Sequence, residues 1–119
     1  MKLKSNNAFI LNNRGYAYMQ LGEMEKAIED INKSIVIDPD NSWAYRNKGI
    51  YFYNSEDYAN AERLINRSIE MNDSLPLSHY FLGKIYIRRG NKEQACQEFK
   101  AAIYHGDIEA KEPYLIYCQ

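Results

Sequence analysis

The sequence has no surplus of charge of either sign and no long apolar run. Its 15 Lys and Arg side chains are balanced by 16 Asp and Glu side chains, which leaves a net charge of -1. Proteins that bind nucleic acid through its phosphates usually carry a basic surplus, so we expect no nucleic-acid partner. The longest apolar runs, such as residues 35–37, fall far short of the roughly 18 residues that cross a bilayer, so we expect no membrane segment.

Residues that carry chemistry are also scarce. The two histidines, His79 and His105, are isolated in the sequence, which contains no nucleophile motif, phosphate-binding loop or metal-ligand cluster. A catalytic site requires groups that converge on one pocket, so we expect no enzymatic activity, no cofactor and no bound metal. His79 is interpreted as a packing residue and His105 as a residue at the negative end of its helix. Residues 1–7 are too polar for the apolar core of a secretory signal, which is therefore either absent or removed.

What the sequence does contain is a repeat of 34 residues, a length typical of helical-hairpin repeats. Glycine and alanine in such a repeat allow two helix axes to approach closely, while aromatic and aliphatic residues fill the adjoining space. The pattern predicts three equivalent hairpins. The aligned sets are Gly15, Gly49 and Gly83; Tyr18, Phe52 and Tyr86; Ala27, Ala61 and Ala95; Ile31, Ile65 and Phe99; Ser34, Ser68 and Ala102; Ile35, Ile69 and Ile103.

Within each repeat the apolar residues follow helical spacing, as Ala27, Ile31 and Ile35 do. Turn-forming residues divide each repeat in half and separate it from the next one, and Pro76 suits the first turn of a helix. The predicted helices lie near residues 8–21, 24–37, 42–54, 58–71, 76–89 and 92–105, with a shorter one near 108–118.

The segment Gly15-Tyr16-Ala17-Tyr18, the residue Ala27 and the exit Asp38-Pro39 resemble the tetratricopeptide repeat pattern. The resemblance covers residues 8 to about 107, and Arg14 stands where the pattern prefers Leu. It implies an all-α fold, a right-handed superhelical array of three antiparallel helix hairpins (a TPR-like α-solenoid) with a C-terminal capping helix. The implied single domain covers residues 1–119, with repeats at 8–41, 42–75 and 76–109 and the cap at 110–119.

The resemblance also implies a concave groove lined by the first helix of each hairpin. Aromatic rings and arginine often anchor interfaces, and Trp43, the only tryptophan, is the expected anchor. Replacing Trp43 by alanine or Arg46 by glutamate is expected to weaken partner binding while leaving the melting temperature nearly unchanged. The expected peptide-binding residues are Asn12, Tyr16, Trp43, Arg46, Asn47, Ile50, Tyr53, Asn54, Tyr80, Lys84, Ile87 and Arg88, with Met19 and Gln20 beside them.

One variant of the family holds the terminal carboxylate of chaperone tails with Lys, Asn, Asn, Lys and Arg. Only Asn47 matches that set here, and the other slots hold Asn12, Tyr16, Leu77 and Phe81. Leu and Phe cannot hydrogen-bond a carboxylate as Lys and Arg do. The sequence therefore disfavours a chaperone-tail clamp.

Two functions remain open at this point. The first is a non-catalytic adaptor that binds a protein or peptide segment in the aromatic and amide-lined groove. The second is a structural or self-associating module, either an end-to-end oligomer or part of a longer array, with no ligand in the groove. Ile10 and Ala17 are expected to face outward from the first hairpin, where they would form the N-terminal edge of a homo-oligomer.

The two cysteines also leave alternatives open. Cys96 and Cys118 lie on either side of the turn at residues 105–107, and antiparallel packing would bring them together. They form either a disulfide that clips the last helix onto the stack or two buried thiols in a reducing cytosol. The expected location is the cytoplasm by default, and the periplasm or the extracellular space if the cysteines are bonded. Pro113 is expected to delay or kink the last helix.

Overall fold

The structure, a computed structural model, describes the backbone of residues 2–118 and the side chains of residues 7–118. Within these residues the chain is helical and contains no strand. The helices α2, α3 and α4 have the predicted bounds, whereas α1 begins before the predicted residue 8 because no Gly or Pro interrupts the preceding residues. The elements are α1 (Lys2–Gln20), α2 (Met24–Ile37), α3 (Ser42–Asn54), α4 (Tyr58–Met71), α5 (Ser78–Arg88), α6 (Lys92–Tyr104), the 3-10 turn η1 (Ile108–Ala110) and α7 (Lys111–Tyr117).

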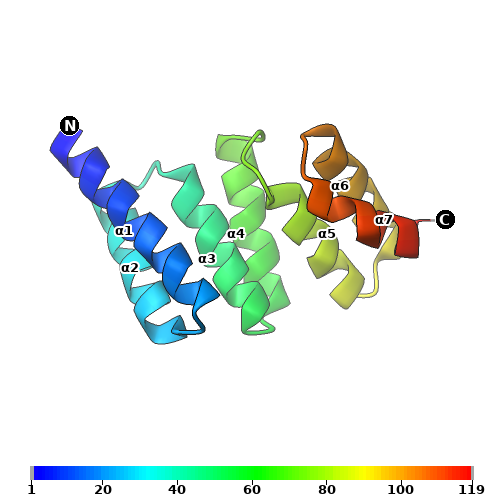
Figure 1. The fold of residues 1–119 in the computed structure, drawn as a ribbon, viewed down its shortest axis with the longest axis horizontal. Helices are drawn as coiled ribbons and strands as arrows, with labels where there is room; N and C mark the ends of the chain where they lie inside the picture. The colour runs from blue at the N-terminus through cyan, green and yellow to red at the C-terminus, as the bar shows by residue number, and fades with distance from the viewer. Residues whose placement is uncertain (1, 119) are drawn as a thin grey trace.

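The six long helices form three hairpins that follow one another along the molecule. Helix α1 packs on α2, α3 on α4 and α5 on α6, and Figure 1 shows these pairs in sequence order from the N-terminus to the C-terminus. Helix α1 also contacts α3, and α3 contacts α5, so the first helices of the hairpins form a continuous layer. The array is elongated, with extents of 47 × 25 × 21 Å. The predicted helical-hairpin array is confirmed.

The three aligned glycines occupy equivalent sites at the helix crossings. A Cβ atom at Gly15 would lie 2.8 Å from Ile31 Cγ1, and one at Gly83 would lie 2.6 Å from Phe99 Cε1. At Gly49 the added atom would overlap Ile65 Cγ1. Each glycine therefore faces the residue that stands sixteen positions later in the second helix of its own hairpin. This equivalence confirms the structural meaning of the 34-residue repeat.

A serine ties the two helices of each of the first two hairpins together. Ser34 Oγ donates a hydrogen bond to the carbonyl oxygen of Ala8 at 2.8 Å, and Ser68 Oγ donates to that of Ser42 at 2.9 Å. The third hairpin has Ala102 at this position, so its equivalent carbonyl, that of Pro76, receives no such bond. A donor from another hairpin takes the place of the missing hydroxyl, as described below.

Arg14, which stands where the family pattern prefers leucine, forms an ion pair inside the first hairpin. Its Nε and Nη2 donate to the two carboxylate oxygens of Asp30 at 2.6 and 2.9 Å. The hydrogen bond from Arg14 lowers the pKa of Asp30 below its usual value. Arg14 thus pairs with a buried carboxylate on α2, and this ion pair links the two helices of the first hairpin.

The start of α5 differs from the prediction, because the helix begins at Ser78 and not at Pro76. Leu77 has a φ angle of 71°, which lies in the left-handed region and interrupts the helix. Asp107 holds this conformation, since its Oδ2 accepts a hydrogen bond from the backbone N–H of Leu77 at 2.8 Å. Sequence spacing alone did not reveal this long-range contact.

The C-terminal cap consists of η1 and α7 in place of one continuous helix over residues 108–118. Pro113 is the third residue of α7, where the missing N–H would have no partner within the helix. The α-helix begins at Lys111, later than the predicted residue 108, in agreement with the expected late start. Cys96 and Cys118 are joined by a disulfide, with their Cα atoms 5.6 Å apart, so the structure selects the bonded alternative. None of the described helices is both long and apolar enough to span a membrane.

Candidate binding groove

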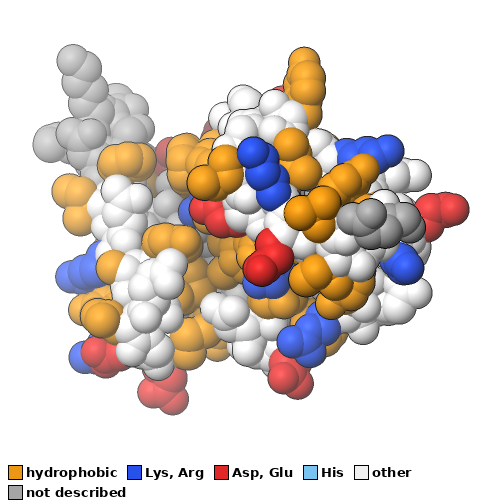
Figure 2. Space-filling view, turned by 45° about the vertical axis from the view of Figure 1, so that its right-hand side comes forward, with side chains coloured by type: hydrophobic (Ala, Val, Ile, Leu, Met, Phe, Trp, Pro, Cys, Tyr) orange, Lys and Arg blue, Asp and Glu red, His pale blue; other side chains and the backbone are white. Residues whose placement is uncertain are grey.

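The first helices of the hairpins line two adjoining pockets on one side of the molecule. Together we call these pockets the inner groove, and Lys84 lines both of them. Figure 2 shows hydrophobic side chains gathered in a hollow between the N-terminal and C-terminal helices. The smaller pocket, about 160 Å³, is lined by Tyr16, Met19, Gln20, Ile50, Asn54, Phe81 and Lys84. The larger, about 270 Å³, is lined by Tyr53, Tyr80, Lys84, Ile87, Arg88, Phe99, Glu112, Pro113, Ile116 and Tyr117.

Lys84 stands at the centre of the inner groove and is surrounded by aromatic rings. Its Nζ lies 5.1 Å from the ring centroid of Tyr53, 5.0 Å from that of Tyr80 and 5.1 Å from that of Phe81. Cation–π attraction of this kind holds an ammonium group in place without neutralising its charge. The side chain is only half-exposed, so its charge is partly desolvated and available to an anion in the groove.

The aromatic walls of the inner groove are themselves packed against one another. The rings of Tyr53 and Phe81 meet edge to face with centroids 5.6 Å apart, and Tyr53 also contacts Tyr58 at 5.8 Å. Burial, with the nearby charges of Glu109 and Glu112, raises the pKa of Tyr80, so its hydroxyl remains protonated at neutral pH. The groove therefore combines fixed apolar walls, a hydroxyl donor and a central cation.

Four of the twelve predicted lining residues lie beneath the surface. The exposed fractions are 1% for Asn12, 4% for Arg46, 1% for Asn47 and 3% for Ile50. Ile50 still forms the floor of the smaller pocket, but the three polar residues line neither pocket. The prediction that Asn12, Arg46 and Asn47 are exposed groove residues is therefore wrong.

These three polar side chains form a buried network between hairpins. Asn47 Nδ2 donates to Asn12 Oδ1 at 2.9 Å, and Asn47 Oδ1 accepts from Arg46 Nε at 3.2 Å and from Arg46 Nη2 at 2.8 Å. Arg46 Nη1 donates to the carbonyl oxygen of Pro76 at 2.8 Å. Arg46 thus supplies the hydrogen bond that Ala102 cannot make, and the network links all three hairpins. Burial lowers the pKa of Arg46, while the nearby charge of Asp107 opposes this effect.

Trp43 is exposed, as an anchor requires, but it does not line the inner groove. Its exposed fraction is 36%, and its ring stacks on the guanidinium of Arg46 at 4.9 Å. Tyr16 lies on the same guanidinium at 5.4 Å and also lines the smaller pocket. Trp43 is therefore connected to the groove through Arg46 and Tyr16 but contacts neither pocket directly.

The remaining eight predicted lining residues are not fully buried, and most of them line the inner groove as predicted. Seven of them line one or both pockets, and Trp43 is the exception. Met19 and Gln20, expected beside them, line the smaller pocket. These seven predicted residues are Tyr16, Tyr53, Asn54, Tyr80, Lys84, Ile87 and Arg88.

Sequence reasoning missed the wall contributed by the cap. Glu112, Pro113, Ile116 and Tyr117 all line the larger pocket, although the C-terminal helix was expected only to cap the stack. The spacing of the two cysteines placed this helix beside α6, but it contains no information about which face of the array α7 crosses. Phe81 was considered only as a clamp position, but it is one of the three aromatic neighbours of Lys84, and its ring contacts those of Tyr53 and Tyr80.

A second cluster of polar residues lies away from the groove, around His79. Its Nδ1 lies 2.7 Å from Glu98 Oε1, and its ring stacks on that of His105 with centroids 5.2 Å apart. The hydrogen bond with Glu98 raises the pKa of His79. The cluster joins α5 to α6, in agreement with the packing role expected for His79. Over the described residues, no group of three or more His, Cys, Asp or Glu is arranged to hold a metal ion.

Comparison with known proteins agrees with this architecture. Two models, each described as tetratricopeptide repeat, match residues 8–41 and 46–111. The chain is 32% identical over 83 residues to tetratricopeptide repeat protein 13 of Homo sapiens, a match that covers 70% of this chain and 10% of that protein. It is 33% identical over 91 residues to the mitochondrial import receptor subunit TOM70 of Homo sapiens, covering 76% of this chain and 15% of the receptor.

Among solved structures, the first tetratricopeptide domain of Spaghetti (RPAP3) superimposes with a TM-score of 0.87 at 21% identity, covering 97% of this chain and 95% of that domain. The chain thus spans only a small part of the curated relatives it matches but nearly the whole of a solved repeat domain. The repeats matched in sequence are the hairpins seen in the structure. The chain belongs to the tetratricopeptide repeat family.

Proposed function

We propose that this chain is a non-catalytic protein-interaction module whose inner groove binds an extended segment of a protein partner. The observation that carries the proposal is the pair of pockets joined by Lys84. Two pockets on either side of a cation can receive alternate parts of one chain, as clefts with few polar groups commonly do. The aromatic, amide and basic side chains that line the two pockets support the same function; they include Tyr16, Gln20, Tyr53, Asn54, Tyr80 and Arg88.

The geometry favours a partner segment with an acidic side chain between two apolar ones. The acidic group would pair with Lys84, whose half-exposed Nζ lies within 5.1 Å of three ring centroids. The smaller pocket, at about 160 Å³, is large enough for one ring, since a cavity of about 150 Å³ holds benzene. The larger pocket, at about 270 Å³, admits a bulkier side chain.

Relatives of the chain support peptide binding in general but not one particular ligand. The RPAP3 domain is described as bound to the HSP90 peptide SRMEEVD, and TOM70 is described as an import receptor. In this chain Asn47, the only match to the chaperone-tail clamp, is buried and bonded to Asn12 and Arg46. We therefore propose a ligand held by the rings around Lys84 and not by a terminal-carboxylate clamp.

Replacing Lys84 by glutamate is expected to abolish most of this binding. Dodecapeptides selected from a random phage-displayed library against the wild-type chain should contain an acidic residue flanked by apolar residues. Their affinity for Lys84→Glu, measured by calorimetry, should fall about 30-fold, since charge reversal at a partly desolvated contact costs about 2 kcal/mol.

The matched control for Lys84 is Arg67 on α4. Its guanidinium lies 5.3 Å from the ring of Tyr45 and outside the inner groove, so Arg67→Glu makes the same charge change at another stacked cation. This variant should bind the selected peptides as tightly as the wild type. Equal losses in both variants, or a library that yields no binder, would refute the proposed groove.

A second candidate function, self-association, is favoured by the apolar surface of the first hairpin. The exposed fractions are 53% for Phe9, 61% for Ile10 and 79% for Val36, and a pocket of about 410 Å³ beside them is lined partly by Leu11 and Ile37. Ile10 and Ala17 are exposed, as expected for an N-terminal edge. An unpartnered apolar face of this kind often marks an interface.

The self-association candidate makes a distinct prediction for Val36. If two copies join through this face, the wild-type chain should show a concentration-dependent dimer in sedimentation velocity, and Val36→Asp should shift the midpoint of dimerisation at least about tenfold upward. Val36→Thr keeps the shape of the side chain and adds no charge, so this variant should dimerise nearly as well as the wild type. A wild-type chain that stays monomeric at millimolar concentration would exclude this function.

A further inference from the structure

We propose that the Cys96–Cys118 disulfide is a thiol–disulfide exchange site that controls the larger pocket of the inner groove, an inference that rests on the proposed peptide-binding function. The first argument is how α7 is attached. The helix has seven residues and none of them is buried, with Ile116 exposed to 64% and Tyr117 to 36%. A helix this short is not stable by itself in water. Its position therefore depends on its packing against α6 and η1, to which Tyr114 contributes contacts with the core, and on the disulfide that follows it.

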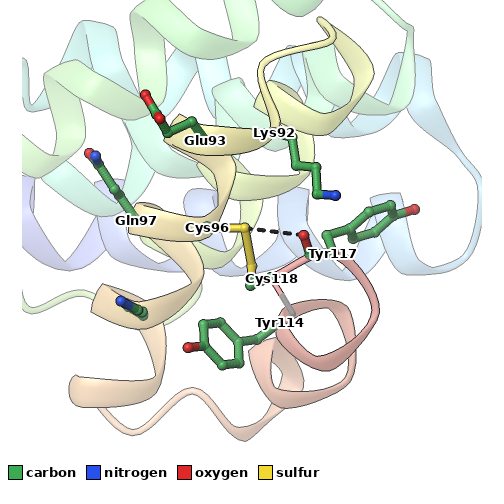
Figure 3. Close-up of a pocket in the computed structure, with 8 residues that line it drawn as sticks. Lys92, Glu93, Cys96, Gln97, Tyr114, Tyr117 and Cys118 are labelled. Carbon is green, nitrogen blue, oxygen red and sulfur yellow. Dashed lines mark hydrogen bonds between the residues drawn. A yellow bond between two sulfur atoms is a disulfide. The ribbon is translucent and has the colours of Figure 1, made fainter.

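The second argument is that the disulfide is accessible. It lies in an open cavity of about 560 Å³ between α6 and α7, with Lys92 and Lys100 among the residues that line it. Figure 3 shows Cys96 joined to Cys118 across this cavity, with Tyr114 and Tyr117 on α7 and Glu93 and Gln97 on α6 around the bond. Neighbouring ammonium groups stabilise both an attacking thiolate and the cysteine thiolate that leaves, and two of them line this cavity against the single carboxylate of Glu93.

Figure 3 also draws a contact between Cys96 and Tyr117 beside the disulfide. Cys96 Sγ lies 3.5 Å from the carbonyl oxygen of Tyr117, but a sulfur in a disulfide carries no hydrogen to donate. In the oxidised chain it is therefore a close contact and not a hydrogen bond, and the disulfide joins the two segments covalently at this point. Once the disulfide is reduced, Cys96 carries an S–H group, which is a weak hydrogen-bond donor.

The third argument connects the bond to the groove. Tyr117 lines the disulfide cavity and also the larger groove pocket, while Glu112, Pro113 and Ile116 line the groove pocket alone. Helix α7 thus separates the two cavities, with the disulfide on one side and Lys84 and its aromatic neighbours on the other. Release of α7 would remove one wall of the groove pocket, together with the apolar contacts of Ile116 and Tyr117.

The exchange reaction needs a dithiol reductant. One thiolate of the dithiol attacks a cysteine sulfur, the Cys96–Cys118 bond breaks, and the other cysteine leaves as a thiolate that takes up a proton. The second thiol of the reductant then attacks the mixed disulfide. The chain ends with two cysteine thiols and the reductant ends as a disulfide, so two electrons and two protons pass to the protein.

Hydrogen–deuterium exchange with and without dithiothreitol tests the site without any peptide. Reduction should speed exchange of the amides of residues 111–117 at least tenfold and leave those of α1 to α4 unchanged. The double variant Cys96→Ser and Cys118→Ser should show the fast exchange without reductant and no response to it. Protection of α7 that is the same before and after reduction, or alkylation of both cysteines in the unreduced chain, would overturn the proposal.

The affinity of the selected peptides measures the coupling to the groove. Reduction should lower it about tenfold in the wild type and leave it unchanged in the double serine variant. Faster exchange of α7 with equal peptide affinities would refute control of the groove while the proposed binding function stands. If no peptide binds either redox form, the proposed function fails, and the control of binding inferred from it fails as well.

Discussion

Replacing Arg46 by glutamate is expected to lower the free energy of unfolding by about 4 kcal/mol, as removal of one partner from a buried charged network typically does. The new carboxylate would face Asn47 Oδ1 and the carbonyl oxygen of Pro76, two acceptors that now receive hydrogen bonds from Arg46. The charge of Asp107 lies near the same site. Urea unfolding followed by circular dichroism measures the change. This expectation replaces the prediction from sequence that Arg46→Glu would leave the melting temperature nearly unchanged.

Three further variants identify the cause. Arg67→Glu makes the same charge change outside the network and should alter stability by less than about 1 kcal/mol. Trp43→Ala removes only the ring stacked on Arg46 at 4.9 Å and should cost about 1 kcal/mol. Adding Ala102→Ser to Arg46→Glu should restore about 1 kcal/mol, because Ser34 and Ser68 make the equivalent hydrogen bond in the other hairpins. An Arg46→Glu variant as stable as Arg67→Glu would contradict the network described here.

Replacing Gly49 by valine is expected to cost about 3 kcal/mol of unfolding free energy, at the upper end of the range for overpacked cores. A Cβ atom at Gly49 would overlap Ile65 Cγ1 and lie 3.2 Å from the carbonyl oxygen of Ala61. The backbone oxygen cannot move aside without disturbing α4, so the two helices must separate. Thermal and urea unfolding should both show the loss.

The control for Gly49→Val is Glu70→Val, at an exposed position of α4, which measures the effect of valine on the helix itself. Its cost should stay below about 1 kcal/mol. Gly49→Ala should fall between the two valine variants, because alanine favours the helix but still brings the first clashing atom. If Gly49→Val were no less stable than Glu70→Val, the close helix crossing at Gly49 would not exist.

The repeat made most of the fold predictable. Glycines at residues 15, 49 and 83 recur at a fixed offset because every hairpin must solve the same steric problem, and that regularity can be read without coordinates. The bounds of α2, α3 and α4 followed from the same periodicity. Eight of the twelve predicted lining residues line a pocket for the same reason, because the face of a first helix is set by its position in the repeat.

The errors fall where one hairpin departs from the others. Ala102 replaces the serine of the earlier repeats, which leaves the carbonyl of Pro76 without its local donor and draws Arg46 inward. The break in the Ser34, Ser68 and Ala102 series was visible, but the partner that compensates for it lies 30 residues away from Pro76. The left-handed conformation of Leu77 and the path of α7 across the groove also depend on contacts that no repeat pattern records.

Amide chemical-shift mapping tests the central claim, peptide binding in the inner groove, most directly. A ¹⁵N-labelled chain titrated with a selected dodecapeptide should show its largest shift changes along α1, α3, α5 and α7, with Lys84 and its aromatic neighbours Tyr53, Tyr80 and Phe81 among the most affected. The amides of the outer faces of α2 and α4 should hardly move. Shift changes that cluster on α2 and α4, with Lys84 unaffected, would contradict the account.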